Sequence, residues 1–126
     1  MAKSETLIMV VDDEPALCRI LERIISGEGY KVIVAMDGEK ALALFKEHNP
    51  EVVLLDLMLP GMNGQEICRR IKELSPVTKV IFLSAKATPK GTAELRELKS
   101  EADGYLPKPA SSRQILSSIQ KVLGNK

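Results

Sequence analysis

Tryptophan is absent from this 126-residue chain, and aromatic residues make up only 3% of it. A core must therefore be built mainly from Val, Ile, Leu and Ala. Hydrophobic residues still account for 44% of the chain, which excludes a disordered protein. The length suits one compact domain, so we expect a single domain over residues 1–126 with its core at about 7–123.

Long apolar runs are also missing. No run approaches the roughly 20 residues that span a bilayer, and the polar N-terminus does not look like a secretory signal. We therefore expect a cytoplasmic protein without membrane contact. The net charge of +1 argues against direct nucleic-acid binding. The two cysteines, Cys18 and Cys68, lie in helical patterns without metal-ligand spacing, which predicts buried free thiols.

Short apolar segments predict five strands. They lie at residues 7–11, 31–36, 52–55, 79–83 and 104–106. The first, third and fourth lack polar alternation, which is typical of parallel strands covered on both faces.

Helical apolar spacing fills the intervals between these strands. The predicted first residues or caps are Pro15, Asp37, Asn63, a start around Pro89, and Ser111 with Gln114 as a capping box. The predicted inward faces include Leu17, Ile20, Leu21, Ile24 and Ile25 in the first helix, Ala41, Leu44 and Phe45 in the second, Ile67, Ile71 and Leu74 in the third, Leu95 and Leu98 in the fourth, and Ile115, Ile119 and Val122 in the last. Strict alternation of strand and helix predicts an α/β fold with a parallel sheet between two helical layers.

Polar residues follow four of the five strands. Asp12 and Asp13 follow the first, Asp56 the third, Ser84 the fourth and Lys108 the fifth. In an open parallel sheet, sites form at the carboxyl ends of strands where the strand order reverses. The pattern therefore favours a doubly wound, flavodoxin-like sheet of order 2-1-3-4-5 flanked by five helices, which gathers these residues and leaves strand 2 out.

Taken singly, each residue also has an ordinary explanation. Asp12 or Asp13 could cap the first helix, and Lys108 could be a solvated surface lysine. Together at four neighbouring strand ends, the residues favour a site.

The residue types predict phosphoryl chemistry at that site. Crowded carboxylates repel one another unless a cation lies among them, and oxygen ligands suit Mg²⁺, with Mn²⁺ as a second candidate. An aspartate can form an acyl phosphate. A lysine ammonium and a hydroxyl can contact phosphoryl oxygens. We expect the Lys108 ammonium at the site mouth, where its loss leaves no core cavity.

Four segments carry a family resemblance. They are VVDDEP at 10–15, LLDLMLPGMNG at 54–64, FLSA at 82–85 and GYLPKP at 104–109. In this order and spacing, the chain from residue 7 to about 123 resembles the receiver domain of bacterial two-component response regulators, with a fold like that of the chemotaxis regulator.

The resemblance implies roles at the site. Asp56 would be the phosphoacceptor, and Lys108 would hold a phosphoryl oxygen. Asp13 and Asp56 would bind Mg²⁺ directly, Asp12 through a water, and the backbone carbonyl of Met58 would be another ligand.

The resemblance also implies a switch. Ser84 would be the switch hydroxyl and Tyr105 the switch aromatic, which together change the surface of helix 4, strand 5 and helix 5. The Lys108–Pro109 peptide would be cis.

The implied partners are a sensor histidine kinase or histidine phosphotransfer protein upstream, and a downstream protein or fused output domain. The domain would be a monomer or a phosphorylation-dependent dimer. It would be an acceptor with intrinsic autodephosphorylation rather than a turnover enzyme.

Two departures from the family pattern stand out. Ser84 and Lys108 are 24 positions apart, which is slightly more than the usual spacing in the family. The additional residues fall within 86–101. Glu101 stands where the family often has glycine, so we expect the end of the fourth helix, next to the output surface, to be built differently.

Several alternatives stay open. One is a silent adaptor, or a phosphate sink or shuttle, with the same fold. Another is an aspartyl phosphatase, although Met58 occupies the position where such enzymes carry a second acid. A third is a flavin-binding domain, in which Asp12, Asp13 and Glu14 would repel the phosphate.

Overall fold

The computed structural model describes residues 5–84 and 102–124. Strands and helices alternate along the chain up to β4. The strands are β1 (Leu7–Val11), β2 (Lys31–Ala35), β3 (Val52–Asp56), β4 (Lys79–Ser84) and β5 (Gly104–Pro107). The helices are α1 (Pro15–Gly27), α2 (Gly38–His48), α3 (Gly64–Leu74) and α5 (Ser112–Leu123). The predicted fourth helix, with Leu95 and Leu98, lies outside the described residues.

All five strands pair in parallel in one sheet, in the order β2-β1-β3-β4-β5. This is the predicted doubly wound topology, and the prediction is confirmed. The order places β1 beside β3 at the centre of the sheet. The chain runs outward from β1 to β2, then crosses to the other side through β3, β4 and β5, so the reversal lies between β1 and β3.

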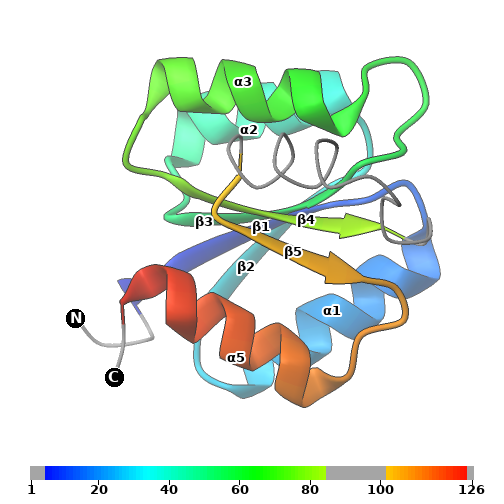
Figure 1. Ribbon diagram of the computed structural model, residues 1–126, viewed down its shortest axis with the longest axis vertical. Coiled ribbons are helices and arrows are strands. Elements are labelled where there is room, and N and C mark those ends of the chain that lie inside the picture. The colour runs from blue at the N-terminus through cyan, green and yellow to red at the C-terminus, as the bar shows by residue number, and fades with distance from the viewer. Residues whose placement is uncertain (1–4, 85–101, 125–126) are drawn as a thin grey trace, which may run out of the picture.

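Two helical layers cover the sheet (Figure 1). Helices α2 and α3 lie on one face, and α1 and α5 lie on the other. Side chains alternate along each strand, so β1 sends Met9 and Val11 to the α2–α3 face and Ile8 and Val10 to the α1–α5 face. Both faces of the central strands are therefore buried, which explains their unbroken apolar sequences.

Helix starts follow the predicted caps in three cases. Asp37, Asn63 and Ser111 each accept a hydrogen bond from a backbone N–H of the first turn, and Ser111 forms the full capping box with Gln114. Helix α1 differs, because its N-cap is Glu14 and no side chain caps it. Neither Asp12 nor Asp13 is therefore used as its cap.

Some element details differ from prediction. Strand β2 ends one residue early, at Ala35, and Met36 is exposed. Strands β3, β4 and β5 each extend one residue further, because Asp56 and Ser84 still pair with neighbouring strands. Two residues predicted to face inward, Ile20 and Leu74, are 55% and 50% exposed. Ile20 lies beside the buried stripe of α1, and Leu74 is the last residue of α3.

The cysteine prediction is confirmed, because Cys18 and Cys68 are both buried and neither forms a disulfide. Among the described residues, no helix is long and apolar enough to cross a membrane.

Candidate functional site

The ends of β1 and β3 lie side by side. Val11 pairs with Leu55, so the residues that follow, Asp12 and Asp56, lie at the same edge of the sheet. The N–H of Asp12 still donates to the carbonyl of Ala35 at 3.1 Å. The strand topology therefore brings together carboxylates that lie 44 positions apart in the sequence.

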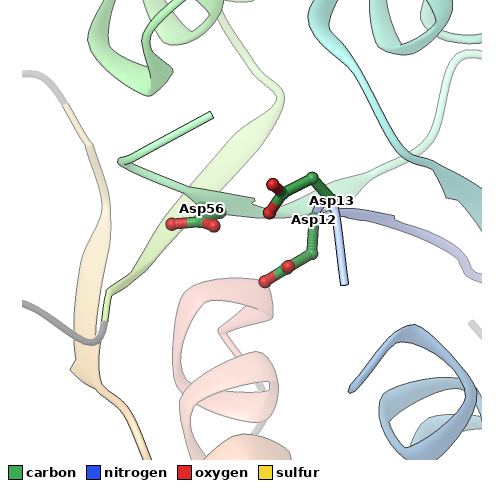
Figure 2. Close-up of side chains that lie close together, drawn as sticks. All are labelled: Asp12, Asp13 and Asp56. Atoms are coloured by element: carbon green, nitrogen blue, oxygen red, sulfur yellow. The ribbon is translucent and has the colours of Figure 1, made fainter. Parts of the chain in front are cut away.

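Asp12, Asp13 and Asp56 form a cluster at this edge. One carboxylate oxygen from each lies within 4.8 Å of the others. Figure 2 shows the three side chains projecting from the adjacent ends of β1 and β3 into a shared space. Asp12 and Asp56 are 1% and 5% exposed, whereas Asp13 is exposed. Such a set of oxygen donors, partly open to solvent, fits a hard divalent cation.

Lys108 places its ammonium against this cluster. Its Nζ donates to Oδ2 of Asp12 at 2.7 Å and lies 3.5 Å from Oδ2 of Asp56. Glu14 is a third neighbour, with Oε1 at 3.7 Å. The lysine side chain is only 12% exposed. Its ammonium therefore lies against the carboxylates and is largely shielded from solvent, and the expectation that it lies at the site mouth stays a prediction.

The charges around Lys108 determine its protonation. Burial alone would lower its pKa, but the hydrogen bond to Asp12 and the charges of Asp12, Asp56 and Glu14 outweigh burial and raise the pKa above the ordinary lysine value. The ammonium therefore stays charged at neutral pH. In this structure it supplies positive charge to two buried carboxylates.

A tight turn after β3 holds Asp56. Its Oδ1 accepts a hydrogen bond from the N–H of Met58 at 3.0 Å. Gly64 lies so close that a Cβ there would be 2.6 Å from the carbonyl oxygen of Asp56 and 2.8 Å from Cα of Leu57. Glycine is therefore required sterically, so that α3 can begin against the backbone of Asp56.

A second turn holds Asp12. Its Oδ1 accepts from the N–H of Glu14 at 3.0 Å, and its backbone carbonyl accepts from Sγ of Cys18 at 3.3 Å. Burial, and then the negative charge of Asp12, raise the pKa of the Cys18 thiol. The thiol therefore stays protonated at neutral pH and remains a donor.

Ser84 and Tyr105 lie on the neighbouring strands. Ser84 is fully buried, and its carbonyl accepts from the N–H of Lys108 at 2.7 Å, which joins the ends of β4 and β5. Tyr105 pairs with Phe82 in register and packs against the α2–α3 side of the core. It therefore lies on the opposite face of the sheet from Leu106.

Most sequence-predicted site residues thus meet at one edge. Asp12, Asp13 and Asp56 form one cluster, Lys108 reaches Asp12 and Asp56, and the predicted cis peptide between Lys108 and Pro109 is confirmed. The side chain of Met58 is exposed. The role of its backbone carbonyl as a metal ligand stays a prediction.

Sequence reasoning missed three contributors. Glu14 was noted only as part of a motif, although it reaches Lys108. The tight approach of Gly64 could have been suspected from the Gly61-Met62-Asn63-Gly64 turn, since glycine often marks a close backbone contact. No signal in the sequence indicated that the Cys18 thiol contacts the Asp12 backbone.

Fold and site together define a class of protein: a parallel α/β domain with an acidic cluster and a lysine at the carboxyl edge of its central strands. Residues 8–120 match the response regulator receiver domain family. The chain therefore belongs to that family.

Individual relatives agree with this assignment. The chain is 40% identical to the DNA-binding response regulator MtrA of Mycolicibacterium smegmatis and 37% identical to the transcriptional regulatory protein TrcR of Mycobacterium tuberculosis. These matches cover 90% and 92% of this chain but only 48% and 44% of the relatives. The chain thus spans about half the length of the curated relatives it matches.

Solved structures are similar as well. The chemotaxis protein CheY4 of Vibrio cholerae matches with a TM-score of 0.84 and 27% identity, over 93% of this chain and 98% of that one. The receiver domain of DrrB activated by BeF₃ matches with a TM-score of 0.82 and 32% identity, over 95% and 98%.

Proposed function

We propose that this receiver domain accepts a phosphoryl group on Asp56, in a reaction that depends on Mg²⁺. The observation that carries the proposal is the arrangement around Asp56. Its carboxylate is buried, lies beside Asp12 and Asp13, and has the Lys108 ammonium 3.5 Å away. Few other functions use a nucleophilic carboxylate, a cation cluster and a lysine in one place.

Each residue of the site has its own role in the phosphoryl transfer. A carboxylate oxygen of Asp56 attacks phosphorus, so that an O–P bond forms while the bond from phosphorus to the donor breaks. Lys108 is close enough to Asp56 to contact a phosphoryl oxygen on it. Asp12, Asp13 and Asp56 would hold Mg²⁺, with Asp12 acting through a water. When bound, the metal neutralises the carboxylates and the incoming phosphoryl oxygens.

The proposed donor is a phosphohistidine on a sensor histidine kinase or a histidine phosphotransfer protein. Small phosphodonors would serve in its place. The domain acts as an acceptor that hydrolyses its own acyl phosphate, rather than as a turnover enzyme. It works in the cytoplasm and passes the signal to a downstream protein or a fused output domain through the surface of the expected fourth helix, β5 and α5.

Metal dependence is the sharpest test of this proposal. Purified protein is incubated with acetyl phosphate, and its intact mass is measured with Mg²⁺, with EDTA, and with EDTA followed by excess Mg²⁺. We expect one added phosphoryl group in the first and third samples and none in the second. Equal labelling in EDTA would show that the carboxylate cluster needs no cation, and would refute the proposal.

A further inference from the structure

Cys18 belongs to none of the groups that hold metal or phosphate, yet its thiol contacts the backbone of the site. It lies in α1 and is 4% exposed. Its Sγ donates to the carbonyl oxygen of Asp12 at 3.3 Å. This bond links the first turns of α1 to the end of β1.

The carbonyl that accepts this bond is part of the peptide that joins Asp12 to Asp13. The sheet holds the preceding peptide, because the N–H of Asp12 donates to Ala35. Beyond that bond the chain leaves the sheet. The orientation of the Asp12–Asp13 peptide is therefore held by the thiol rather than by a neighbouring strand.

The Asp13 carboxylate depends on the orientation of this peptide more than the carboxylates of Asp12 and Asp56 do. The Asp12 carboxylate is held by Lys108 and by the N–H of Glu14. The Asp56 carboxylate is held by the N–H of Met58. Within residues 5–84 and 102–124, the Asp13 side chain has neither a hydrogen bond nor an ion pair. Apart from rotation of the side chain itself, the placement of the Asp13 carboxylate therefore depends on its backbone.

We propose that Cys18 is a positioning residue for the metal site, which acts through the Asp12 carbonyl to fix the direction of Asp13. This proposal rests on the proposed function, because it assumes that the cluster binds Mg²⁺. Groups that orient metal ligands commonly change metal affinity by about 10–100-fold. A thiol is a weak donor, although burial strengthens its bond. We therefore expect a smaller effect, of about three- to tenfold.

Cys68 provides a matched control. It is also a buried cysteine in a helix and forms no disulfide, but it lies in α3 on the opposite face of the sheet. Replacing either cysteine with alanine removes a sulfur atom from the core and creates a similar small cavity. Only the Cys18 change removes a donor to the Asp12 carbonyl.

The test is an Mg²⁺ titration of ¹⁵N-labelled protein, followed by amide chemical shifts. The variants are Cys18→Ala, Cys18→Ser and Cys68→Ala. We expect Cys18→Ala to raise the Kd for Mg²⁺ by about three- to tenfold, Cys18→Ser to restore affinity near that of the parent, and Cys68→Ala to leave it unchanged. The amide proton of Asp13 shares the affected peptide, so its shift in the metal-free protein should change in Cys18→Ala and recover in Cys18→Ser.

The outcomes separate the two proposals. Equal Mg²⁺ affinity in Cys18→Ala and the parent overturns the role of Cys18 and leaves the proposed function intact. Equal weakening in Cys18→Ala and Cys68→Ala also overturns it, because the cause is then general loss of packing. Failure of the serine variant to recover affinity points to sulfur packing and again overturns it. A parent protein that binds no Mg²⁺ overturns both proposals.

Discussion

The ammonium of Lys108 lies 2.7 Å from Oδ2 of Asp12, although 96 positions separate the two residues. Their side chains are 12% and 1% exposed. The pair therefore joins the end of β5 to the end of β1 across the intervening strands, in a place where water screens charge poorly. Without a bound cation, this lysine is the group that compensates the buried carboxylates of Asp12 and Asp56.

We predict that Lys108→Ala destabilises the metal-free protein by about 2 kcal/mol, since a buried carboxylate then loses its partner. Mg²⁺ should recover part of this loss, because a cation can replace the missing charge. Urea unfolding in EDTA and in Mg²⁺ measures both effects. The control is Lys79→Ala, because the Lys79 side chain is 43% exposed and its Nζ lies 4.0 Å from Oδ1 of Asp103; this variant should change stability little. Unfolding curves for Lys108→Ala that match the parent in EDTA would contradict this account.

The pH dependence of that stability difference follows from the raised pKa of Lys108. Its folded pKa lies above the ordinary value of 10.5, so the charged lysine contributes its full stabilisation below 10.5. The contribution is lost as the pH rises through the folded pKa. The gap in free energy of unfolding between the parent and Lys108→Ala should therefore stay constant through neutral and mildly alkaline pH and narrow only in strong alkali. A gap that closes near neutrality would be inconsistent with a charged Lys108.

Gly64 is predicted to be the least replaceable glycine near the site. In Gly64→Ala the added Cβ meets the Asp56 carbonyl oxygen at 2.6 Å, which is backbone that cannot move away cheaply. We expect a loss of about 1–3 kcal/mol in urea unfolding, together with slower phosphorylation of Asp56. Gly27→Ala is the matched control, because nothing lies within 4 Å of its added Cβ. Equal stabilities of the two variants would show that α3 tolerates a shift away from Asp56.

Much of this architecture could be predicted from sequence because the signals are local. Unbroken apolar strands predicted a sheet buried on both faces, and cap residues such as Asp37 and Asn63 set where helices begin. The strand order followed from a single further fact, that nothing comparable to the site residues follows the second strand. Topology then brought Asp12, Asp13, Asp56 and Lys108 together as expected.

What the sequence could not provide are distances and burial, which depend on packing between distant elements. The exposure of Ile20 and Leu74 depends on where the sheet stops covering a helix. The inward position of Lys108 depends on the balance between burial and the attraction of Asp12. The contact of Cys18 with the Asp12 carbonyl depends on how α1 leaves β1, which no residue pattern records.

The switch is a further prediction, and it involves Ser84 and Tyr105. A phosphoryl group on Asp56 offers strong acceptor oxygens one strand away from the buried Ser84 hydroxyl. Movement of that hydroxyl would change the packing of Tyr105 at the α2–α3 side of the core. Amide shifts with and without beryllofluoride should change most, beyond the site itself, at residues 86–101 and 104–113. Changes confined to Asp12, Asp13, Asp56 and their neighbours would indicate a phosphate sink or shuttle.

The most direct measurement of the central claim is the intact mass of the protein after incubation with acetyl phosphate and Mg²⁺, compared between the parent and Asp56→Asn. The variant keeps the shape of the side chain but loses the nucleophilic carboxylate, and a folding control by circular dichroism confirms that the sheet is intact. Glu47→Gln, which neutralises an exposed carboxylate on α2, controls for the loss of one negative charge. The account predicts one phosphoryl group on the parent and on Glu47→Gln, and none on Asp56→Asn. Equal labelling of Asp56→Asn would contradict it, because the acceptor would then be another residue.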